Sequence, residues 1–365
     1  MSNRSSRVRS ALLAGAALAP IVTGGARAQQ FIPEIIISST VPPKPHADLN
    51  PYGVAFVPSN FPTGGVIAPG DILVSNFNDP KNVQGTGRTI IKLTPNGVVA
   101  PPMAASSFFT SKLVGLTTAL GVLQRGFVVV GNLPNSSGTL SPGSLQFIDL
   151  NGHVVKTLVD PLIDGPWDLT IDDDPVHPTI YVSNVLNGTV VRLNLTLSDK
   201  SVTLNSRTTI AAGYTFEPNA AALVLGPTGL AHDRSSDILY VASTADNAIF
   251  AIPSASTTSP SNPGTGTMIA QGGQLRGPLA LVLAPNGNLV TCNGDAVNAD
   301  PTQPSEIVEL TKSGQFVGQF NVDAGQGGAF GIAITVVNGD TAQLAVVDDN
   351  ANDIIVIDQK VIPGG

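Results

Sequence analysis

The feature that most restricts the fold of this chain is a short phrase that recurs six times along it. Each copy has a proline or small residue, then a glycine or polar step, then an apolar run. The copies begin 51 to 62 residues apart, at Pro51, Leu113, Pro166, Pro227, Pro278 and Ala329. Repeats of this length that contain several short strands are typical of β-propellers, in which each repeat forms one four-stranded blade. We therefore predict an all-β fold, a six-bladed β-propeller.

The segments between the copies have the composition of strands and tight turns. In the first copy, the runs at 53–57, 72–76 and 89–93 are rich in Val, Ile and Thr, which favour strands. The 38 glycines and 29 prolines of the chain suit many tight turns. No window after the first 28 residues has a sustained helical period. Because each blade of a ring packs only on its neighbours, we expect 29–365 to form a single propeller domain.

The first 28 residues have the pattern of a signal peptide. The basic residues Arg4, Arg7 and Arg9 precede a short apolar run at 11–22, and Ala26-Arg27-Ala28 forms a small-x-small cleavage site. We expect cleavage near Ala28 and an exported protein, either periplasmic or secreted. The apolar run is too short to span a bilayer stably, and no later segment is long enough, so we expect no membrane span.

Charge and cysteine content limit the classes of partner. The chain has 18 basic and 26 acidic residues, and no basic cluster with interleaved aromatic residues. A surface of this sign disfavours nucleic acids and anionic lipids. The single Cys292 excludes an internal disulfide, and we expect its thiol to be buried. We expect a monomer whose partner is a small molecule or another protein.

The ring of blades has to close, and the last copy contains only three clear strands, at 331–337, 343–348 and 353–358. A β-branched run at 33–38 directly follows the signal peptide. We predict that this N-terminal strand is the outer strand of the last blade, because that arrangement gives each end of the chain a partner and leaves no blade incomplete.

The repeats resemble NHL-type repeats over about residues 33 to 359. The opening block reads NPYGVAFVP at 50–58, PGDILVSNFN at 69–78 and QGTGRTI at 84–90. It is similar to exported bacterial NHL-type propellers, most of which have no assigned activity. The wider superfamily includes gluconolactonases, paraoxonases, the amidating lyase, virginiamycin B lyase and strictosidine synthase. The resemblance implies a six-bladed fold and leaves the chemistry open, because one fold supports many activities.

Polar residues gather where the second strand of each copy ends, and these strand ends lie on one face of a propeller. Aligning the second strands places Asn76, Asn132, Asn184, Ser243, Cys292 and Asp348 at equivalent positions. We predict a ligand-binding face formed by Asn76, Asn78, Asn132, Trp167, Asp168, Asn184, Asp246, Asn293 and Asp348.

Two interpretations of these Asn and Asp residues stay open. Their side chains can cap turns by accepting hydrogen bonds from nearby backbone N–H groups. They can also supply oxygen ligands to Ca²⁺, which takes carboxylates and amide carbonyls. The candidate metal ligands are Asn184, Asp246 and Asp348. Ca²⁺ is the one cofactor that the pattern suggests.

Loops and a single tryptophan mark the same face. Long loops are expected at 78–88 and 293–305, and an insertion at 211–226 could cover the face. Trp167 opens an inner strand and is expected near the axis, beside Asp168, where the pair suits a small polar ligand. The alternative is that Trp167 plugs the tunnel or packs between blades. The run at 172–174 is interpreted as a solvated turn on the opposite face.

The patterns of particular enzymes are mostly missing. The four histidines do not converge, and the opening Asp48-Leu49-Asn50-Pro51 lacks the Glu that gluconolactonases have there. No catalytic residue is assigned. We carry two hypotheses: a non-catalytic exported propeller that binds a ligand or partner through its loop-rich face, and a Ca²⁺-dependent hydrolase or lyase of the gluconolactonase, paraoxonase or virginiamycin B lyase kind. The missing Glu and histidines favour the first.

Overall fold

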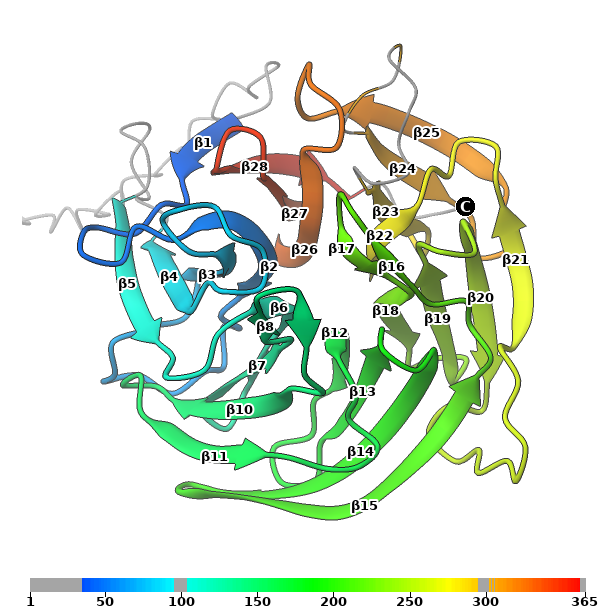
Figure 1. The fold of residues 1–365 in the computed structure, drawn as a ribbon, viewed down its shortest axis with the longest axis horizontal. Coiled ribbons are helices and arrows are strands. Elements are labelled where there is room, and N and C mark those ends of the chain that lie inside the picture. Colours follow the sequence, from blue (N-terminus) through cyan, green and yellow to red (C-terminus); the bar gives the residue numbers. More distant parts are fainter. Residues whose placement is uncertain (1–34, 95–103, 295–301, 303, 305, 362–365) are drawn as a thin grey trace, which may run out of the picture. The chain divides into compact units, whose positions relative to one another are not determined.

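The structure is a computed structural model that describes residues 35–94, 104–294, 302, 304 and 306–361. Six four-stranded antiparallel sheets are arranged around a common axis as blades (Figure 1). The prediction of an all-β, six-bladed propeller is therefore confirmed. A search of the described residues for a helix that is long and apolar enough to cross a membrane finds none. The predicted signal peptide at 1–28 and most of the predicted loop at 293–305 lie outside the described residues.

In the first three blades the strands follow one another in chain order from the axis outwards. Blade 1 contains β2 (Leu49–Phe56), β3 (Ile72–Asn78), β4 (Thr89–Thr94) and β5 (Ala104–Thr110). Blade 2 contains β6 (Leu116–Leu123), β7 (Phe127–Asn132), β10 (Ser144–Asp149) and β11 (Val154–Leu158). Blade 3 contains β12 (Pro166–Asp172), β13 (Thr179–Asn184), β14 (Thr189–Ser198) and β15 (Ser201–Ala212).

The remaining blades complete the ring. Blade 4 contains β18 (Pro227–Asp233), β19 (Ile238–Ser243), β20 (Ala248–Pro253) and β21 (Thr267–Gln271). Blade 5 contains β22 (Pro278–Leu283), β23 (Leu289–Asn293), β24 (Glu306–Leu310) and β25 (Phe316–Asn321). Blade 6 contains β26 (Ala329–Asn338), β27 (Thr341–Asp348), β28 (Asp353–Lys360) and β1 (Ile35–Ser39). Two short hairpins interrupt this pattern, β8 (Asn135–Ser136) with β9 (Thr139–Leu140) and β16 (Glu217–Asn219) with β17 (Leu223–Leu225).

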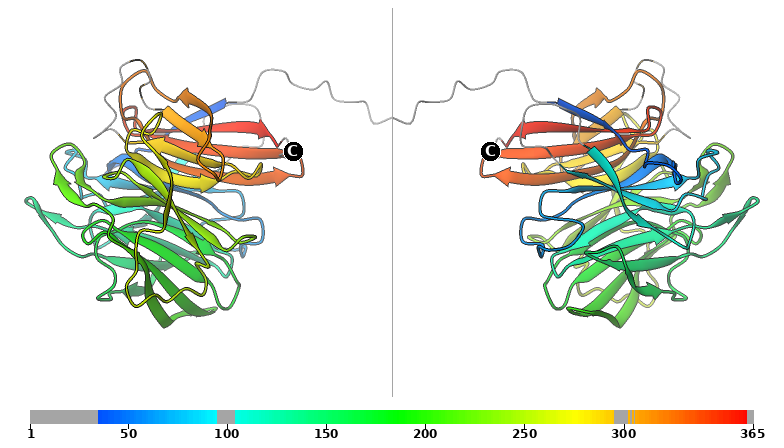
Figure 2. Two further views of the ribbon diagram at one scale, coloured as in Figure 1. Left: turned by 90° about the vertical axis from the view of Figure 1, so that its right-hand side faces the viewer. Right: turned by 90° about the vertical axis from the view of Figure 1, so that its left-hand side faces the viewer.

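The N-terminal strand closes the ring, as the sequence predicts. β1 pairs antiparallel with β28, from Ile35 opposite Ile357 to Ser39 opposite Asp353. The side views show β1 in blue beside β28 in red (Figure 2). The two ends of the described chain thus share one sheet, and β1 covers the edge that β28 would otherwise expose.

The register of the inner strands corrects two sequence alignments. In blades 3 to 6 the first residue of the phrase pairs with the last residue of the second strand, as Pro166 does with Asn184. In blade 1 Pro51 pairs with Asn76, two residues before the end of β3. In blade 2 this pair is Leu116 with Asn132, so the second copy starts three residues later than its glycine suggests. In blade 5 the pair is Pro278 with Asn293, so Asn293 and not Cys292 is the equivalent residue. The buried Cys292 instead packs between blades 5 and 6.

In every inner strand the pairing register shifts after the first residue of the phrase, and small residues stand at this point in most blades. The third residue of the phrase is Gly53, Thr118, Asp168, Gly229, Ala280 and Gly331 in blades 1 to 6. A Cβ atom at Gly229 would overlap the backbone of blade 5, and one at Gly331 would overlap the Tyr52 carbonyl oxygen of blade 1. Glycine in the phrase therefore lets neighbouring inner strands approach closely around the axis.

Hydroxyl groups link these inner strands from blade to blade. Ser75 Oγ donates to the Thr117 carbonyl at 2.8 Å, and Thr117 Oγ1 donates to the Pro166 carbonyl at 2.8 Å. Ser183 Oγ then donates to the Thr228 carbonyl at 2.6 Å, and Thr228 Oγ1 donates to the Pro278 carbonyl at 3.0 Å. Inner strands are sheet edges, so their carbonyl groups need partners that the sheet itself does not supply. The hydroxyls of blades 1 to 4 provide them.

Candidate functional site

The predicted asparagines at the strand ends are buried and hold loops in place. Asn184 Oδ1 accepts a hydrogen bond from the Asp164 N–H at 2.9 Å, and its Nδ2 donates to the Leu162 carbonyl and to Thr189 Oγ1. Asn293 repeats this pattern, with the Arg276 N–H as donor and the Gln274 carbonyl as acceptor. In both blades the side chain fixes the segment that leads into the inner strand. The turn-capping interpretation describes what these two residues do.

In blades 1 and 2 the same position is used with different partners. Asn132 donates to the Val114 carbonyl and accepts from Ser144 Oγ. Asn76 donates to the Thr40 carbonyl at 3.2 Å, and Asn78 donates to Asn82 Oδ1 at 2.8 Å. All three asparagines are at most 2% exposed. Asn76 and Asn78 belong to blade 1 and Asn132 to blade 2, at the same face of the ring.

Two of the three carboxylates predicted for this face, Asp246 and Asp348, are also engaged with their own chain. Asp246 Oδ2 accepts from Ser243 Oγ at 2.6 Å and from the Thr215 N–H at 3.2 Å. Asp348 Oδ1 accepts from the Asn350 N–H at 3.0 Å. Burial, together with the negative charge of Asp323, raises the pKa of Asp348. Asn184, Asp246 and Asp348 belong to blades 3, 4 and 6, and the described residues contain no cluster of three His, Cys, Asp or Glu residues suited to a metal ion.

An aromatic cluster fills the axis on the loop-rich face. Tyr52 stacks between Phe77 and Phe330, with ring centroids 4.5 Å away in each case. Trp167 lies against Tyr52 and Phe77 at 5.7 and 5.6 Å and is 2% exposed. Trp167 therefore plugs the tunnel on this side, which is the alternative that the sequence left open.

The insertion at 211–226 covers this aromatic cluster. Val224 of β17 packs in the same apolar cluster as Tyr52, Trp167 and Phe330. Figure 1 shows the β16–β17 hairpin drawn over the inner part of the ring. Gln84 of the long loop at 78–88 reaches the hairpin, where its Nε2 donates to the Ala221 carbonyl at 2.6 Å. The void left under the hairpin measures only about 10 Å³, so the described residues leave no room there for a ligand.

A channel of about 240 Å³ lies on the axis below this aromatic cluster. Residues from all six inner strands line it, and the lining runs along them from the third residue of the phrase towards their C-terminal ends. Thr170, Ile171, Val282 and Ala333 of this lining are partly exposed. The channel therefore opens on the face opposite the loop-rich one.

Asp168 is the one ionisable residue among the described residues that line this channel. Its side chain is 9% exposed, and its Oδ1 accepts from the Leu169 N–H at 2.7 Å. Burial raises the pKa of the Asp168 carboxyl well above its ordinary value, against the opposing effect of hydrogen bonds from the Leu169 and Leu230 N–H groups. The sequence places Asp168 near the axis, but the plug separates its carboxyl from the loop-rich face.

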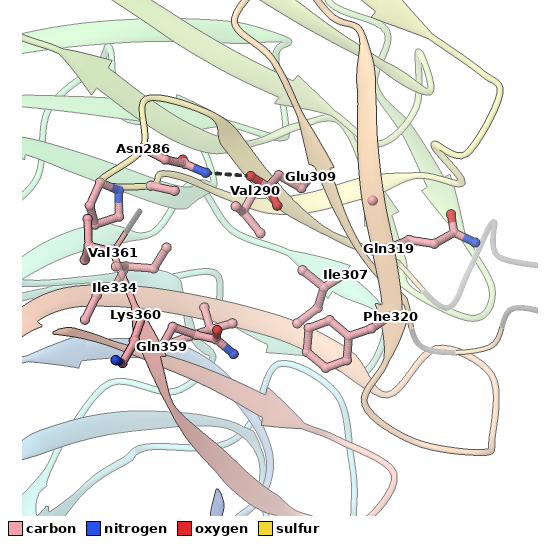
Figure 3. Close-up of a pocket in the computed structure, with 15 residues that line it drawn as sticks. Asn286, Val290, Ile307, Glu309, Gln319, Phe320, Ile334, Gln359, Lys360 and Val361 are labelled. Carbon is pink, nitrogen blue, oxygen red and sulfur yellow. Dashed lines mark hydrogen bonds between the residues drawn. The ribbon is translucent and has the colours of Figure 1, made fainter. Parts of the chain in front are cut away.

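A larger groove of about 420 Å³ lies between blades 5 and 6 (Figure 3). Its walls include Val290, Ile307, Phe320 and Leu344. The carboxylate in it, Glu309, accepts hydrogen bonds from the side-chain amides of Asn286 and Asn288 at 2.9 and 2.7 Å. No sequence motif pointed to this groove, because its lining residues come from several consecutive strands of blades 5 and 6, each of which supplies only a few. Glu309 is only half-buried, whereas Asp168 is buried in a channel lined by all six inner strands, so the axial channel is the stronger candidate.

The acidic turn at 172–174 does more than face solvent. Asp173 Oδ2 accepts from the Gln124 N–H of blade 2 at 2.8 Å, and Asp172 forms an ion pair with Arg234 of blade 4. Asp174 caps its own turn by accepting from the His177 N–H at 2.7 Å. The turn therefore clamps blades 2, 3 and 4 together on the face where the channel opens, a role that the sequence does not predict.

No protein-family model matches the sequence, and a search of curated proteins finds no match. Solved structures share the fold. A gluconolactonase from Xanthomonas campestris superposes with a TM-score of 0.54 at 11% identity, over 89% of each chain. A luciferin-regenerating enzyme gives 0.51 at 13% identity, over 91% of this chain and 98% of its own. A PQQ-bound aldose sugar dehydrogenase from Streptomyces coelicolor gives 0.50 at 15% identity, over 92% of this chain and 100% of its own.

These neighbours share the propeller alone, and their named activities differ. They are gluconolactonase-like and related enzyme propellers, and they do not single out the NHL type that the repeats resemble. A fold that is shared by a lactonase and a sugar dehydrogenase does not select a chemistry. The function has to be argued from the site.

Proposed function

We propose that this protein is an exported, non-catalytic propeller that binds a small molecule in its axial channel, at Asp168. One observation carries the proposal. Five of the six inner strands place a small residue at the third position of the phrase, and only blade 3 places a carboxyl there. A single acid in a channel whose lining mixes polar and apolar surface can anchor the polar end of a small ligand.

The size of the channel supports a small ligand. Its volume of about 240 Å³ falls below the ~300–1,000 Å³ of sites for drug-sized molecules. The walls are formed by side chains such as Leu120, Leu169 and Val282, with Thr118 and Thr170 as the hydroxyl groups. These walls would bury the apolar body of a ligand, and Asp168 would orient its polar end.

The composition of the lining favours binding over catalysis. General acid–base catalysis needs a titratable group in reach of the reacting atoms, and hydrolysis of an ester or lactone also needs an activated water or nucleophile. Asp168 is the single ionisable group among the described lining residues, so a partner that would activate water is not placed beside it. Export belongs to the proposal because it depends on the signal peptide predicted at 1–28.

Ligand-induced thermal stabilisation tests this function. The mature protein is titrated with n-butanol, n-butylamine, butyrate and gluconolactone, and a ligand that binds the folded state raises the melting temperature. The half-buried channel wall Val282 is changed to Phe, and the exposed Val336, which is 57% exposed, is changed to Phe as the matched control. We expect V282F to abolish stabilisation and V336F to retain it. Stabilisation that V282F leaves unchanged would place the ligand elsewhere.

A Ca²⁺-dependent lactonase is the second candidate, because a gluconolactonase shares the fold over most of the chain. Gluconolactone hydrolysis is measured with Ca²⁺ and with EDTA. If Ca²⁺ supports hydrolysis and EDTA abolishes it, the lactonase function would replace the proposed binding function. We expect the hydrolysis rate to equal the uncatalysed rate under both conditions.

A further inference from the structure

The carboxyl of Asp168 is the one formally charged group that the described lining of the channel can present to a ligand. The strands packed around it contribute Gly53, Thr118, Ala280 and Gly331 at the same level, and Ser183 of β13 on its other side. None of these side chains is ionisable. On β18 the next ionisable residue is His232, whose ring contacts Asp237 and Tyr181 and not the channel. No lysine, arginine or histidine of the described lining compensates Asp168.

Both donors of the Asp168 carboxyl are backbone N–H groups of inner strands. The Leu169 N–H is local, and the Leu230 N–H belongs to blade 4. A carboxylate has about four lone-pair positions, so these two donors leave acceptor capacity. Asp168 is among the residues that line the channel. A ligand that donates hydrogen bonds can therefore use oxygens that the protein itself does not fully occupy.

From this geometry we infer that the axial channel selects a small organic cation, an ammonium with a compact apolar body, that pairs with the carboxylate of Asp168. The inference rests on the proposed function, because it names the ligand class of that channel. A buried carboxylate without a partner is costly, and a ligand cation supplies the missing charge together with hydrogen bonds. The carboxylate would repel an anion, because the described lining contains no basic side chain to offset its charge.

The face on which the channel opens carries charge of the right sign. The turns between first and second strands there contain Asp172, Asp173 and Asp174 in blade 3 and Asp233 in blade 4. Arg234 pairs with Asp172, and Lys312 pairs with Asp233 at 2.6 Å. Asp173 and Asp174 remain as a local acidic excess, which raises the local concentration of cations and disfavours anions.

Binding should release a proton. Without ligand, burial holds the pKa of Asp168 above that of an ordinary carboxyl, so the group keeps its proton to higher pH. A bound ammonium favours the ionised form, and the proton leaves to solvent as the ligand binds. Affinity for the ammonium should therefore fall as the pH is lowered. A neutral ligand of the same shape should show no such dependence.

The test compares n-butylamine with its neutral counterpart n-butanol and its anionic counterpart butyrate. Calorimetric titrations are run in two buffers of different ionisation enthalpy, which count the protons released. We expect the amine to bind at least about tenfold more tightly than the alcohol and to release a proton, because charge-assisted hydrogen bonds are the stronger ones. Butyrate should not bind.

Two variants locate the effect. Asp168→Asn keeps the shape of the side chain and removes the charge, and it should reduce the affinity for the amine to that for the alcohol. Asp174→Asn removes one exposed acid from the face on which the channel opens and should preserve the preference for the amine. If Asp168→Asn does not fold, the number of protons that the parent protein releases on binding the amine tests the inference instead.

The outcomes separate the two proposals. Equal affinity for amine and alcohol, or an amine preference that survives in Asp168→Asn, would overturn the cation inference and leave a binding channel. Stabilisation by Na⁺ or Ca²⁺ in place of the amine would also overturn it. Binding that V282F leaves unchanged would overturn the proposed function itself.

Discussion

At the scale of single residues, equivalent positions in the six repeats have taken different roles. The residue that ends the second strand is an asparagine in four blades, a serine in blade 4 and an aspartate in blade 6. In blades 3 and 5 the asparagine side chain makes the same set of hydrogen bonds to the segment before the inner strand. The sequence predicts these residues as ligands or turn caps, and the contacts make them structural anchors of the inner strand.

Asn184→Ala should destabilise the protein by about 1–3 kcal/mol, because it removes the partners of the half-buried Asp164 N–H and Leu162 carbonyl. Urea unfolding measures the change. Asn151→Ala is the matched control, since Asn151 lies exposed in a turn and should change stability by no more than about 0.5 kcal/mol. An unchanged unfolding midpoint for Asn184→Ala would show that water replaces these bonds at no cost.

The pKa of Asp353 should make stability depend on pH. Burial, with the negative charges of Asp348 and Asp323, raises the pKa of Asp353 from 3.8 to about 6. A carboxyl whose pKa is higher in the folded state stabilises that state when protonated, so this contribution is present at low pH and is lost as the pH rises through about 6. The melting temperature should therefore be higher near pH 5 than near pH 7.5.

Asp353→Asn should reduce this difference and raise the melting temperature at the higher pH. The raised pKa of Asp348 acts in the same direction, so part of the dependence should persist. Asp233, whose pKa is lowered, acts in the opposite direction but only at more acidic pH. A parent protein that melts at a lower temperature near pH 5 than near pH 7.5 would contradict the assignment.

At the scale of elements, two short segments determine which parts of the ring are accessible. β1 completes blade 6 and covers the edge of β28. The β16–β17 hairpin closes the loop-rich end of the axis over Trp167. The candidate site therefore lies on the face opposite the loop-rich one, although the asparagines and one long loop led the sequence analysis to predict the loop-rich face.

Deleting residues 29–40 should lower the melting temperature sharply and promote aggregation, because it removes β1 and exposes the edge of β28. Thermal scans and light scattering measure both effects. The matched control replaces Ile35 and Ile37 with Thr, since both side chains are 55% exposed and the strand itself is kept. A deletion variant that melts like the parent would mean that the ring closes without β1.

Val224→Asn should loosen the hairpin from the aromatic cluster and expose Trp167, because an amide is poorly accommodated against these rings. Trp167 is the only tryptophan, so acrylamide quenching of its emission reports the change directly. Phe216→Asn is the control, since Phe216 is 48% exposed near the hairpin. Quenching that is equal in both variants would show that the hairpin does not shield the indole.

At the scale of the whole molecule, the apolar core is divided into wedges between adjacent blades. Between blades 2 and 3, for example, Val129 and Phe147 pack in one cluster with Ile180 and Val191. A change in one wedge should therefore affect its two blades more than distant ones. The groove between blades 5 and 6 is the place where such a wedge is left partly open (Figure 3).

The start of the mature chain stays a prediction at this scale. The basic, apolar and small-residue pattern of 1–28 predicts cleavage near Ala28 and a mature protein that begins at about Gln29. Intact-mass measurement of the protein recovered from the periplasm or medium checks the cleavage site. A mass that includes the first 28 residues would contradict the export proposal.

The fold could be predicted from the amino-acid sequence, because blade formation depends on local information repeated six times. Strand propensity, turn residues and the phrase at Pro51, Pro166 or Pro227 are all readable along the chain. Even the closing strand was predictable, since a blade with three strands requires a fourth and only one β-branched run was left over. The predicted register of blade 2 was wrong because Gly115, which has a φ of 75°, precedes the strand and imitates the glycine of the phrase.

The position of the candidate site depends on contacts between distant parts of the chain. The sequence could place Asp168 near the axis but could not tell on which side of the aromatic plug its carboxyl would open. That depends on Tyr52, Phe77, Trp167 and Phe330, which three different blades bring together, and on a hairpin whose partners are distant in the chain. A channel bounded by six strands is a property of their packing, because no segment of the chain contains more than one of its walls.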